Sequence, residues 1–174
     1  CVLGKAIGNG YPITVVMGKE EIMQNAQDTF ISSTFWTDKI GSVAALKTLD
    51  EMQKNKTWVK ISETGKIIKK KWKKLSIKYK LKLNILGLDA LPSFSIESAN
   101  WLKYKTFITQ EMLKNNILAS NAVYVSTCHN EKQIKKYFKI LDNIFCKIEK
   151  FEKGLNVDKY LHGPTCHSSF KRLN

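Results

Sequence analysis

The residue best suited to chemistry in this 174-residue chain is Lys5, which lies between an apolar run and a glycine-rich turn in the segment LGKAIGNGYPITVVMGK. A lysine amine has an ordinary pKa of about 10.4, and it becomes a nucleophile near neutral pH when burial or neighbouring cations lower that pKa. Val2, Leu3, Ala6 and Ile7 could supply an apolar surrounding. The segment therefore indicates a lysine that forms a Schiff base, although a solvated turn at a strand end has the same residue types.

The turn after this lysine leaves room for a ligand. Gly8 and Gly10 permit backbone conformations and close approaches that a residue with a Cβ resists, and Tyr11 and Pro12 stiffen the exit from the turn. Residues 13–17 are rich in β-branched side chains, which predicts a buried strand. A bulky ligand could therefore lie against the turn.

A second segment, ISSTFWTDKIGSVAALKTLDEM, combines a threonine turn with a helix of small residues. Backbone N–H groups and hydroxyls at a turn before a helix are suited to binding anions, which makes Thr34 a candidate binding residue. The alternative is an ordinary helix entry in which Ser32, Ser33 and Thr34 act only as caps.

Both segments, at similar spacing, resemble class III aminotransferases, the group that includes glutamate-1-semialdehyde aminomutase and the omega-amino acid transaminases. The family run GK-x-x-G-x-G-[FY]-P falls on residues 4–12. The resemblance implies the cofactor pyridoxal 5'-phosphate, with Lys5 as the catalytic residue that holds it as a Schiff base. It also implies that Thr34 binds the cofactor phosphate of the neighbouring subunit in a homodimer.

The reaction implied by the resemblance is a ping-pong transfer of an amino group between a small-molecule amino donor and a keto acid. The alternative within the family is glutamate-1-semialdehyde 2,1-aminomutase, which shifts an amino group within its semialdehyde substrate. The family's serine-glycine-asparagine-proline run is replaced here by Trp36, Thr37, Asp38 and Lys39. This departure, together with Asn9, favours a transaminase and predicts a bulkier or more polar rim to the site.

Other parts of the family pattern have no match in this chain. Family members are much longer, and the phosphate loop, the aromatic that stacks on the cofactor and the carboxylate that pairs with its ring nitrogen lie in the unmatched part. The resemblance therefore implies a C-terminal part of a longer polypeptide, and we expect this part alone to be inactive. A truncated, inactive paralogue that acts as a basic binding module is the remaining alternative.

The formal net charge of +14 raises the question of an anionic partner. Nine lysines and no acids lie between Lys66 and Lys82. Apolar side chains recur through this run at helical spacing, at Ile61, Ile68, Trp72, Leu75 and Tyr79. The pattern predicts a helix docked on a core, with lysines facing solvent. The run also lacks the arginines that favour phosphate and base contacts, so we expect no nucleic acid and no membrane partner.

The cysteines and histidines do not have the spacing of a metal site. Cys128 and His129 precede a helix, and His162, Cys166 and His167 lie near the end of the chain. Neither group has the C-x-x-C or H-x3-H spacing typical of zinc ligands, so we predict no metal. No apolar run reaches the roughly 18 residues that span a membrane. Four unpaired cysteines then favour a cytoplasmic protein with free thiols.

Periodicity and turn signals predict an α/β chain. Asn130 and Gln133 form a plausible capping pair for a long helix that reaches Phe151. A break is expected near Thr64 and Gly65 in the basic helix. The other expected elements are helices at 19–25, 40–54 and 99–114, and strands at 80–88, 93–96 and 117–126.

We interpret these elements as three domains. Residues 1–55 are the end of a cofactor-binding large domain, residues 56–79 a basic connecting helix, and residues 80–174 a small C-terminal α/β domain with a mostly antiparallel sheet. Relatives in the family have this arrangement, in the architecture called fold type I.

Overall fold

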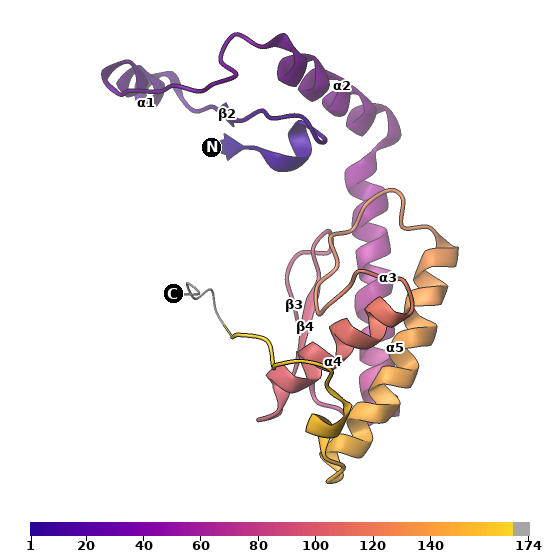
Figure 1. The fold of residues 1–174 in the computed structure, drawn as a ribbon. Helices are drawn as coiled ribbons and strands as arrows, with labels where there is room; N and C mark the ends of the chain where they lie inside the picture. The colour runs from indigo at the N-terminus through magenta and orange to yellow at the C-terminus, as the bar shows by residue number, and fades with distance from the viewer. Residues whose placement is uncertain (169–174) are drawn as a thin grey trace. The chain divides into compact units, whose positions relative to one another are not determined.

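The structure of the chain is a computed structural model that describes residues 1–168 (Figure 1). The chain divides into two compact units, residues 1–57 and the residues from 58 onward, which we call unit 1 and unit 2. The domain boundaries expected at residues 55 and 79 stay a prediction, and the last six residues of the third domain lie outside the described residues.

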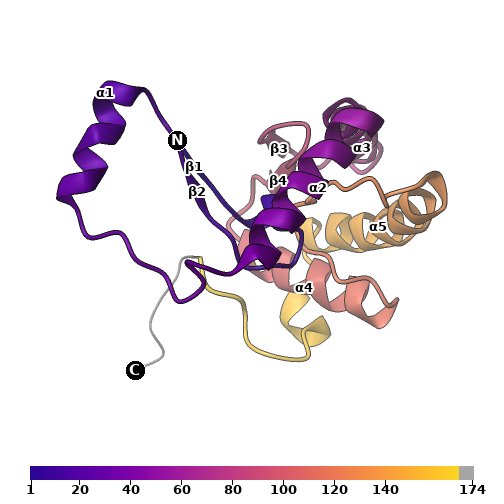
Figure 2. The ribbon, with the colours of Figure 1, turned by 90° about the horizontal axis from the view of Figure 1, so that it is seen from above.

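Unit 1 contains a two-stranded antiparallel sheet, in which Val2 lies opposite Val16 and Leu3 opposite Val15. Figure 2 shows the two strands side by side. The buried strand predicted at 13–17 is wrong in length and in burial, since Val16 is exposed and no second layer covers the sheet within unit 1. The elements are β1 (Val2–Leu3), the 3-10 helix η1 (Lys5–Ile7), β2 (Val15–Val16), α1 (Glu20–Met23), the 3-10 helix η2 (Gln24–Asp28) and α2 (Lys39–Asn55).

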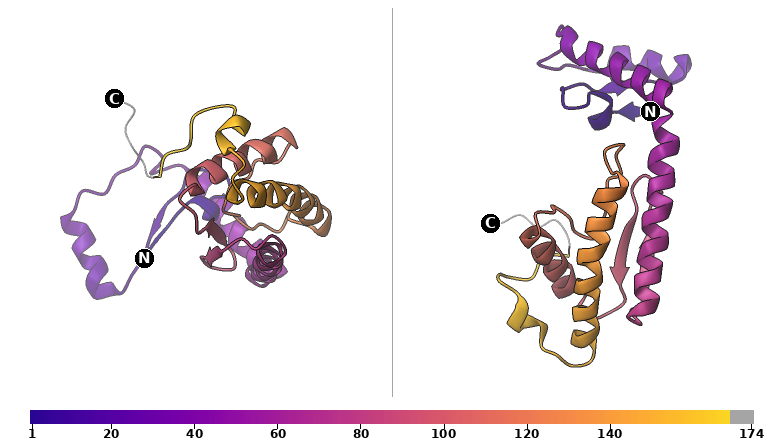
Figure 3. Two further views of the ribbon diagram at one scale, coloured as in Figure 1. Left: turned by 90° about the horizontal axis from the view of Figure 1, so that it is seen from below. Right: turned by 90° about the vertical axis from the view of Figure 1, so that its right-hand side faces the viewer.

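Unit 2 packs three long helices and a two-stranded antiparallel sheet around one hydrophobic core. Helices α3 and α5 lie side by side (Figures 1 and 3). In the sheet, Leu83 lies opposite Ile96 and Leu86 opposite Ser93. The elements are α3 (Thr57–Lys78), β3 (Leu83–Leu86), β4 (Ser93–Ile96), α4 (Trp101–Lys114), α5 (Glu131–Glu152) and the 3-10 helix η3 (Val157–Tyr160).

The long helix α5 confirms its sequence signals. Asn130 Oδ1 accepts a hydrogen bond from the backbone N–H of Gln133 at 3.1 Å, and Gln133 Oε1 accepts one from the N–H of Asn130 at 3.0 Å. This capping box satisfies two donors at the start of the helix. The apolar face that the spacing predicted is buried, at Phe138, Leu141, Ile144, Phe145, Ile148 and Phe151.

The break predicted near Thr64 and Gly65 is wrong, because α3 runs without interruption from Thr57 to Lys78. The chain turns instead at Lys56, whose φ of 47° lies in the left-handed region and ends α2. Gly65 is buried inside the helix, where a Cβ would lie 1.6 Å from the carbonyl oxygen of Asp89. Gly65 therefore allows the backbone of Asp89 to approach α3 closely, and it does not end the helix.

The strand predicted at 117–126 is also wrong. The segment lies beside β4, with the N–H of Val123 donating to Pro92 O at 3.0 Å and the N–H of Val125 donating to Ala90 O at 3.0 Å. It forms only an isolated bridge, Ser93 opposite Ala122. Pro92 has no N–H to return the hydrogen bond, so a regular ladder cannot extend past it.

The core centres on Trp72, which is fully buried between the helices and the sheet. Its ring lies edge-on to Phe94 at 4.8 Å between centroids, and Phe94 in turn lies 5.8 Å from Phe145. Trp72 Nε1 donates a hydrogen bond to Tyr137 Oη at 3.1 Å. Burial raises the pKa of Tyr137 well above its ordinary value, so this hydroxyl stays neutral.

Two lysines of α3 form ion pairs with other elements of unit 2. Lys69 Nζ lies 2.9 Å from Asp89 Oδ1, and Lys78 Nζ lies 2.7 Å from Asp142 Oδ1. The face between the lysines is buried or half-buried as the spacing predicted, from Ile61 through Trp72 to Tyr79. Every helix within the described residues is too short or too polar to span a bilayer.

We expect Tyr137→Phe to destabilise unit 2 by about 1–3 kcal/mol, because it leaves the buried Nε1–H of Trp72 without an acceptor. Urea unfolding followed by tryptophan fluorescence measures the change. Tyr124→Phe is the matched control, since Tyr124 is 79% exposed. Equal effects of the two substitutions would show that the Trp72 hydrogen bond contributes nothing.

Candidate functional site

Lys5 is the first residue of η1 and is held in an uncommon backbone conformation. Its φ of 53° lies in the left-handed region, which costs a residue with a Cβ about 1–2 kcal/mol. The turn closes with the N–H of Gly8 donating to Lys5 O at 3.2 Å and the N–H of Tyr11 donating to Gly8 O at 3.0 Å. Gly8 is buried, and a Cβ there would lie 2.1 Å from Tyr11 O. The predicted lysine loop is therefore a tight, hydrogen-bonded turn.

Val2, Leu3, Ala6 and Ile7 do not give Lys5 the buried apolar surrounding that was expected of them. Lys5, Val2, Leu3 and Ala6 are exposed, and Ile7 is half-buried. The reason is that β1 belongs to a two-stranded sheet without a covering layer in this unit. Residues 1–7 alone thus do not remove the amine from water.

A cavity of about 770 Å³ in unit 1 brings Lys5 together with the threonine-turn segment. A volume of this size is within the range of small-molecule and cofactor sites. Phe35 and Trp36 both line the cavity, whereas the bulkier or more polar rim expected for the cofactor site stays a prediction. Residues from the lysine loop and from the segment before α2 share the lining, including Lys5, Tyr11, Ser32, Ser33, Trp36 and Asp38.

Thr34 lies in the turn at residues 34–37 and is exposed. Its neighbours Ser33 and Phe35 line the cavity, whereas Thr34 is not among the lining residues of the described chain. The structure of one chain therefore places Lys5, Ser32 and Ser33 around one cavity, and it does not place Thr34 in the lining of that cavity.

Asp38 has a role that the sequence reasoning missed. It is the N-cap of α2, and its Oδ1 accepts a hydrogen bond from the N–H of Ile40 at 2.8 Å. The alternative in which Ser32, Ser33 and Thr34 cap the helix is therefore wrong. An aspartate directly before the first helical residues is the signal that could have identified this cap.

Gly41 holds α2 against the lysine loop. It is buried in the first turn of α2, and a Cβ at this position would lie 2.7 Å from Pro12 O and 3.1 Å from Ile13 Cβ. Because Pro12, Ile13 and Gly41 also line the cavity, this contact fixes one wall of it.

The histidines and cysteines do not add a metal centre to the described chain. Within residues 1–168, no three His, Cys, Asp or Glu side chains gather as metal ligands. His129 Nδ1 instead accepts a hydrogen bond from the N–H of Ser126 at 2.9 Å, and the N–H of Cys166 donates to Thr106 Oγ1 at 2.9 Å.

The family model of class III aminotransferases matches residues 1–156, which is most of the chain and includes both the lysine loop and the threonine turn. The chain belongs to this family. The resemblance drawn from residues 3–52 is thereby confirmed.

Curated relatives agree with this assignment. The chain is 29% identical over 118 residues to a 3-aminobutyryl-CoA aminotransferase of Cloacimonas acidaminovorans, covering 66% of this chain and 28% of that protein. It is 25% identical over 144 residues to glutamate-1-semialdehyde 2,1-aminomutase of Saccharolobus islandicus, covering 74% of this chain and 34% of the relative. The chain thus spans about a third of the length of these relatives.

Solved structures show the same fold. The FumI protein of Sphingopyxis sp. MTA144, solved in its PLP internal aldimine form, matches with a TM-score of 0.79 at 18% identity and covers 91% of this chain and 39% of that one. An omega-transaminase from Sphaerobacter thermophilus matches with a TM-score of 0.72 at 15% identity, over 83% of this chain and 37% of its own. The predicted α/β class is confirmed, and the fold is consistent with the C-terminal part of fold type I transaminases.

We expect Gly41→Ala to disturb the lysine loop. The added Cβ would push against the backbone of Pro12, and overpacking of this kind costs about 1–3 kcal/mol, more than the gain in helix propensity of about 1 kcal/mol. Limited proteolysis of residues 1–38 measures the loosening. Gly18→Ala is the control, because its Cβ would meet Met23 at an ordinary 3.5 Å. Identical cleavage of both variants would contradict a wall role for Gly41.

Proposed function

We propose that this class III aminotransferase chain moves amino groups with Lys5 as the catalytic amine and pyridoxal 5'-phosphate as cofactor. The proposal rests on one observation: Lys5 and the hydroxyl-bearing residues Ser32 and Ser33 line the same cavity of about 770 Å³. Lys5 also lies on the loop that matches the family's lysine run. Because the chain spans about a third of its relatives, the activity is proposed for the complete polypeptide that carries it.

The residues of the cavity fit such a cofactor. Lys5 offers a primary amine at the end of a flexible side chain, and the buried Gly8 keeps the turn behind it compact. Ser32 and Ser33 offer hydroxyl groups to polar atoms of a ligand. When bound, pyridoxal phosphate supplies an electron sink that makes transfer of an amino group feasible.

Lys5 would have two tasks in this proposal. Its Nζ would attach the cofactor covalently, which fixes the cofactor's position in the cavity. Once an incoming amine has displaced it, the free Nζ would act as a base that accepts a proton and returns it. Lys5 is exposed within unit 1, so the desolvation that favours a neutral amine must come from whatever covers the cavity in the assembled protein.

Thr34 would bind the cofactor phosphate of a neighbouring subunit. Its exposure in the turn at 34–37, outside the lining of its own chain's cavity, supports a role in another site. A hydroxyl and backbone N–H groups in a turn before a helix suit an anion. In a homodimer of this kind, Lys5 and Thr34 of one chain work in different active sites.

The internal amino shift of an aminomutase is the alternative reaction, and the similarity to glutamate-1-semialdehyde 2,1-aminomutases supports keeping it. The bulky side chain of Trp36 at the cavity rim favours the transaminase. The two reactions differ in one requirement, because transfer between molecules needs an added keto acid and the internal shift does not. Product formation without a keto acid would therefore decide for the aminomutase.

We expect borohydride reduction of the native protein to fix a pyridoxyl group on Lys5, detected by peptide mass spectrometry. Lys5→Ala should lose the label and about 10²–10⁴-fold of the turnover rate, because it removes both the attachment point and the base. Lys19→Ala is the control, since Lys19 lies outside the cavity lining. Turnover of Lys5→Ala at the parental rate would end the proposal.

Hybrid dimers test the role of Thr34. If Thr34 serves the partner's site, a dimer of one Lys5→Ala chain and one Thr34→Ala chain has one intact site and one doubly defective site. Random pairing should therefore restore activity at about a quarter of all sites.

Activity of the mixture above the summed activities of the two parent variants supports the shared site. If Thr34 serves its own chain's cavity, every site in the hybrid lacks one residue and no activity returns. Thr34→Ser, which keeps the hydroxyl, is the control and should retain cofactor affinity.

A further inference from the structure

A second hollow, unrelated to the Lys5 cavity, lies within unit 2 among α4, α5 and the segment that follows α5. Its volume is about 460 Å³. Phe107, Ile140, Ile144 and Tyr160 form its apolar part, and Phe107 and Ile144 belong to the buried core. The hollow thus has an apolar base built from elements far apart in the sequence.

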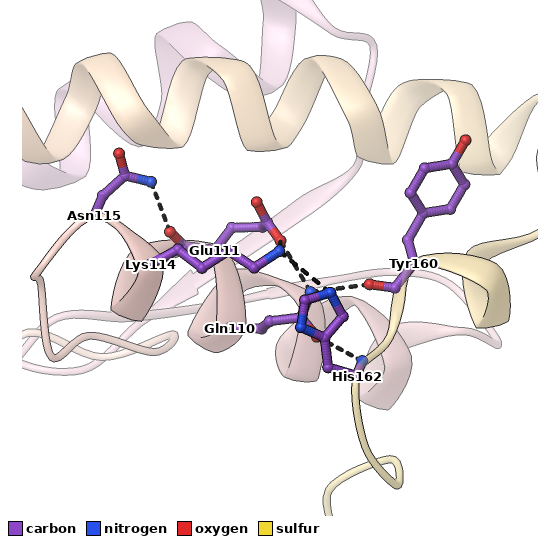
Figure 4. Close-up of polar contacts among 6 residues, drawn as sticks. All are labelled: Gln110, Glu111, Lys114, Asn115, Tyr160 and His162. Carbon is purple, nitrogen blue, oxygen red and sulfur yellow. Dashed lines mark hydrogen bonds and ion pairs between the residues drawn. The ribbon is translucent and has the colours of Figure 1, made fainter.

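A network around Gln110 holds the wall of this hollow in place (Figure 4). Gln110 Oε1 accepts a hydrogen bond from the backbone N–H of His162 at 2.8 Å. Gln110 Nε2 donates to Tyr160 O and to Glu111 Oε1, each at 2.9 Å. The segment after α5 is therefore tied to α4 through one side chain.

Positive charge gathers around the apolar base. Lys114, Lys147 and Lys159 line the hollow from α4, α5 and η3, and Glu111 is the acidic residue among them. Lys114 Nζ lies 2.7 Å from Glu111 Oε1, whereas Lys147 Nζ lies 3.9 Å above the centroid of the Tyr160 ring. Within residues 1–168, neither Lys147 nor Lys159 has a carboxylate within ion-pair distance of its ammonium.

Glu111 neutralises one of these charges. Burial acts to raise the pKa of its carboxyl, but hydrogen bonds from Lys114 and Gln110 outweigh burial and lower that pKa below its ordinary value. An ionised Glu111 offsets Lys114, which leaves the two other lysines without compensation. The hollow therefore carries an excess of positive charge.

The end of α4 does not cancel this charge. The last carbonyl groups of a helix carry partial negative charge. Here Met112 O accepts hydrogen bonds from the N–H groups of Asn115 and Ile117, each at 3.0 Å, and Leu113 O accepts from Asn116 N–H at 2.9 Å. The side chain of Asn115 donates to Glu111 O at 2.8 Å. These carbonyls are already paired within the protein.

We propose that this hollow binds a small phosphate monoester whose organic part rests on Phe107, Ile140 and Ile144, while Lys147 and Lys159 hold the phosphate. Lysine is a compact point charge that suits a phosphate group. Lys147 Nζ lies over one face of the Tyr160 ring, and this cation–π contact restrains the position of the cation beside the hollow. A neutral ligand would leave the excess charge uncompensated, and inorganic phosphate would leave the apolar base uncovered.

Phenyl phosphate is a suitable probe, since it combines a phosphate monoester with a small apolar group. Titration of the whole chain, followed by isothermal calorimetry and by the NMR signal of the His162 amide, measures binding at this site. We expect saturable binding in the millimolar range or tighter, and weaker binding of inorganic phosphate. Lys147→Gln and Lys159→Gln should each weaken the binding of phenyl phosphate about tenfold.

Lys150→Gln is the matched control, because Lys150 is an exposed lysine of α5 outside the hollow. It should leave the dissociation constant unchanged. Equal weakening by Lys150→Gln and Lys147→Gln would show attraction to the net charge of the protein and would overturn the proposal. So would the absence of a saturable shift at His162, or equal affinities for phenyl phosphate and inorganic phosphate. Thermal unfolding of each variant checks that the fold is retained.

Discussion

Both units depend on close contact between a glycine of a helix and the backbone of another segment, which a residue with a Cβ would prevent. In unit 1, Gly41 lets α2 rest on the carbonyl of Pro12, and this contact forms a wall of the cavity beside Lys5. In unit 2, Gly65 lets α3 rest on the backbone of Asp89. A single methyl group at either position would separate the elements that build the site or the core.

The parts of the fold that could be predicted from the sequence are those fixed by local signals. The capping pair Asn130 and Gln133 and the regular apolar spacing up to Phe151 specify α5 within a few residues of its observed ends. The match around Lys5 was likewise predictable, because its glycine and proline pattern is contained in nine residues. In both cases the necessary information lies within a short stretch of chain.

The errors arose where the outcome depends on distant residues. Gly65 predicts a break when only its neighbours are considered, but its role in α3 is set by Asp89 on the loop between β3 and β4. The segment at 117–126 has strand-like residues, yet Pro92 opposite it lacks the donor that a ladder needs. Lys5 is exposed beside a sheet of two strands in unit 1, and no local sequence pattern reports this exposure. Asp38 shows the reverse case, because its cap signal is local and lies directly before the helix.

Gln110 is a side chain that neither substitution nor deamidation can change without loss of hydrogen bonds. Its amide uses an oxygen to hold His162 and a nitrogen to hold Tyr160 and Glu111. Glutamate keeps the length but has no donor, and asparagine keeps the amide but is one carbon shorter. Deamidation would set a new carboxylate against the carbonyl of Tyr160 and the carboxylate of Glu111. No other standard amino acid therefore has both the length and the donor and acceptor atoms of glutamine, and we expect Gln110 to be conserved.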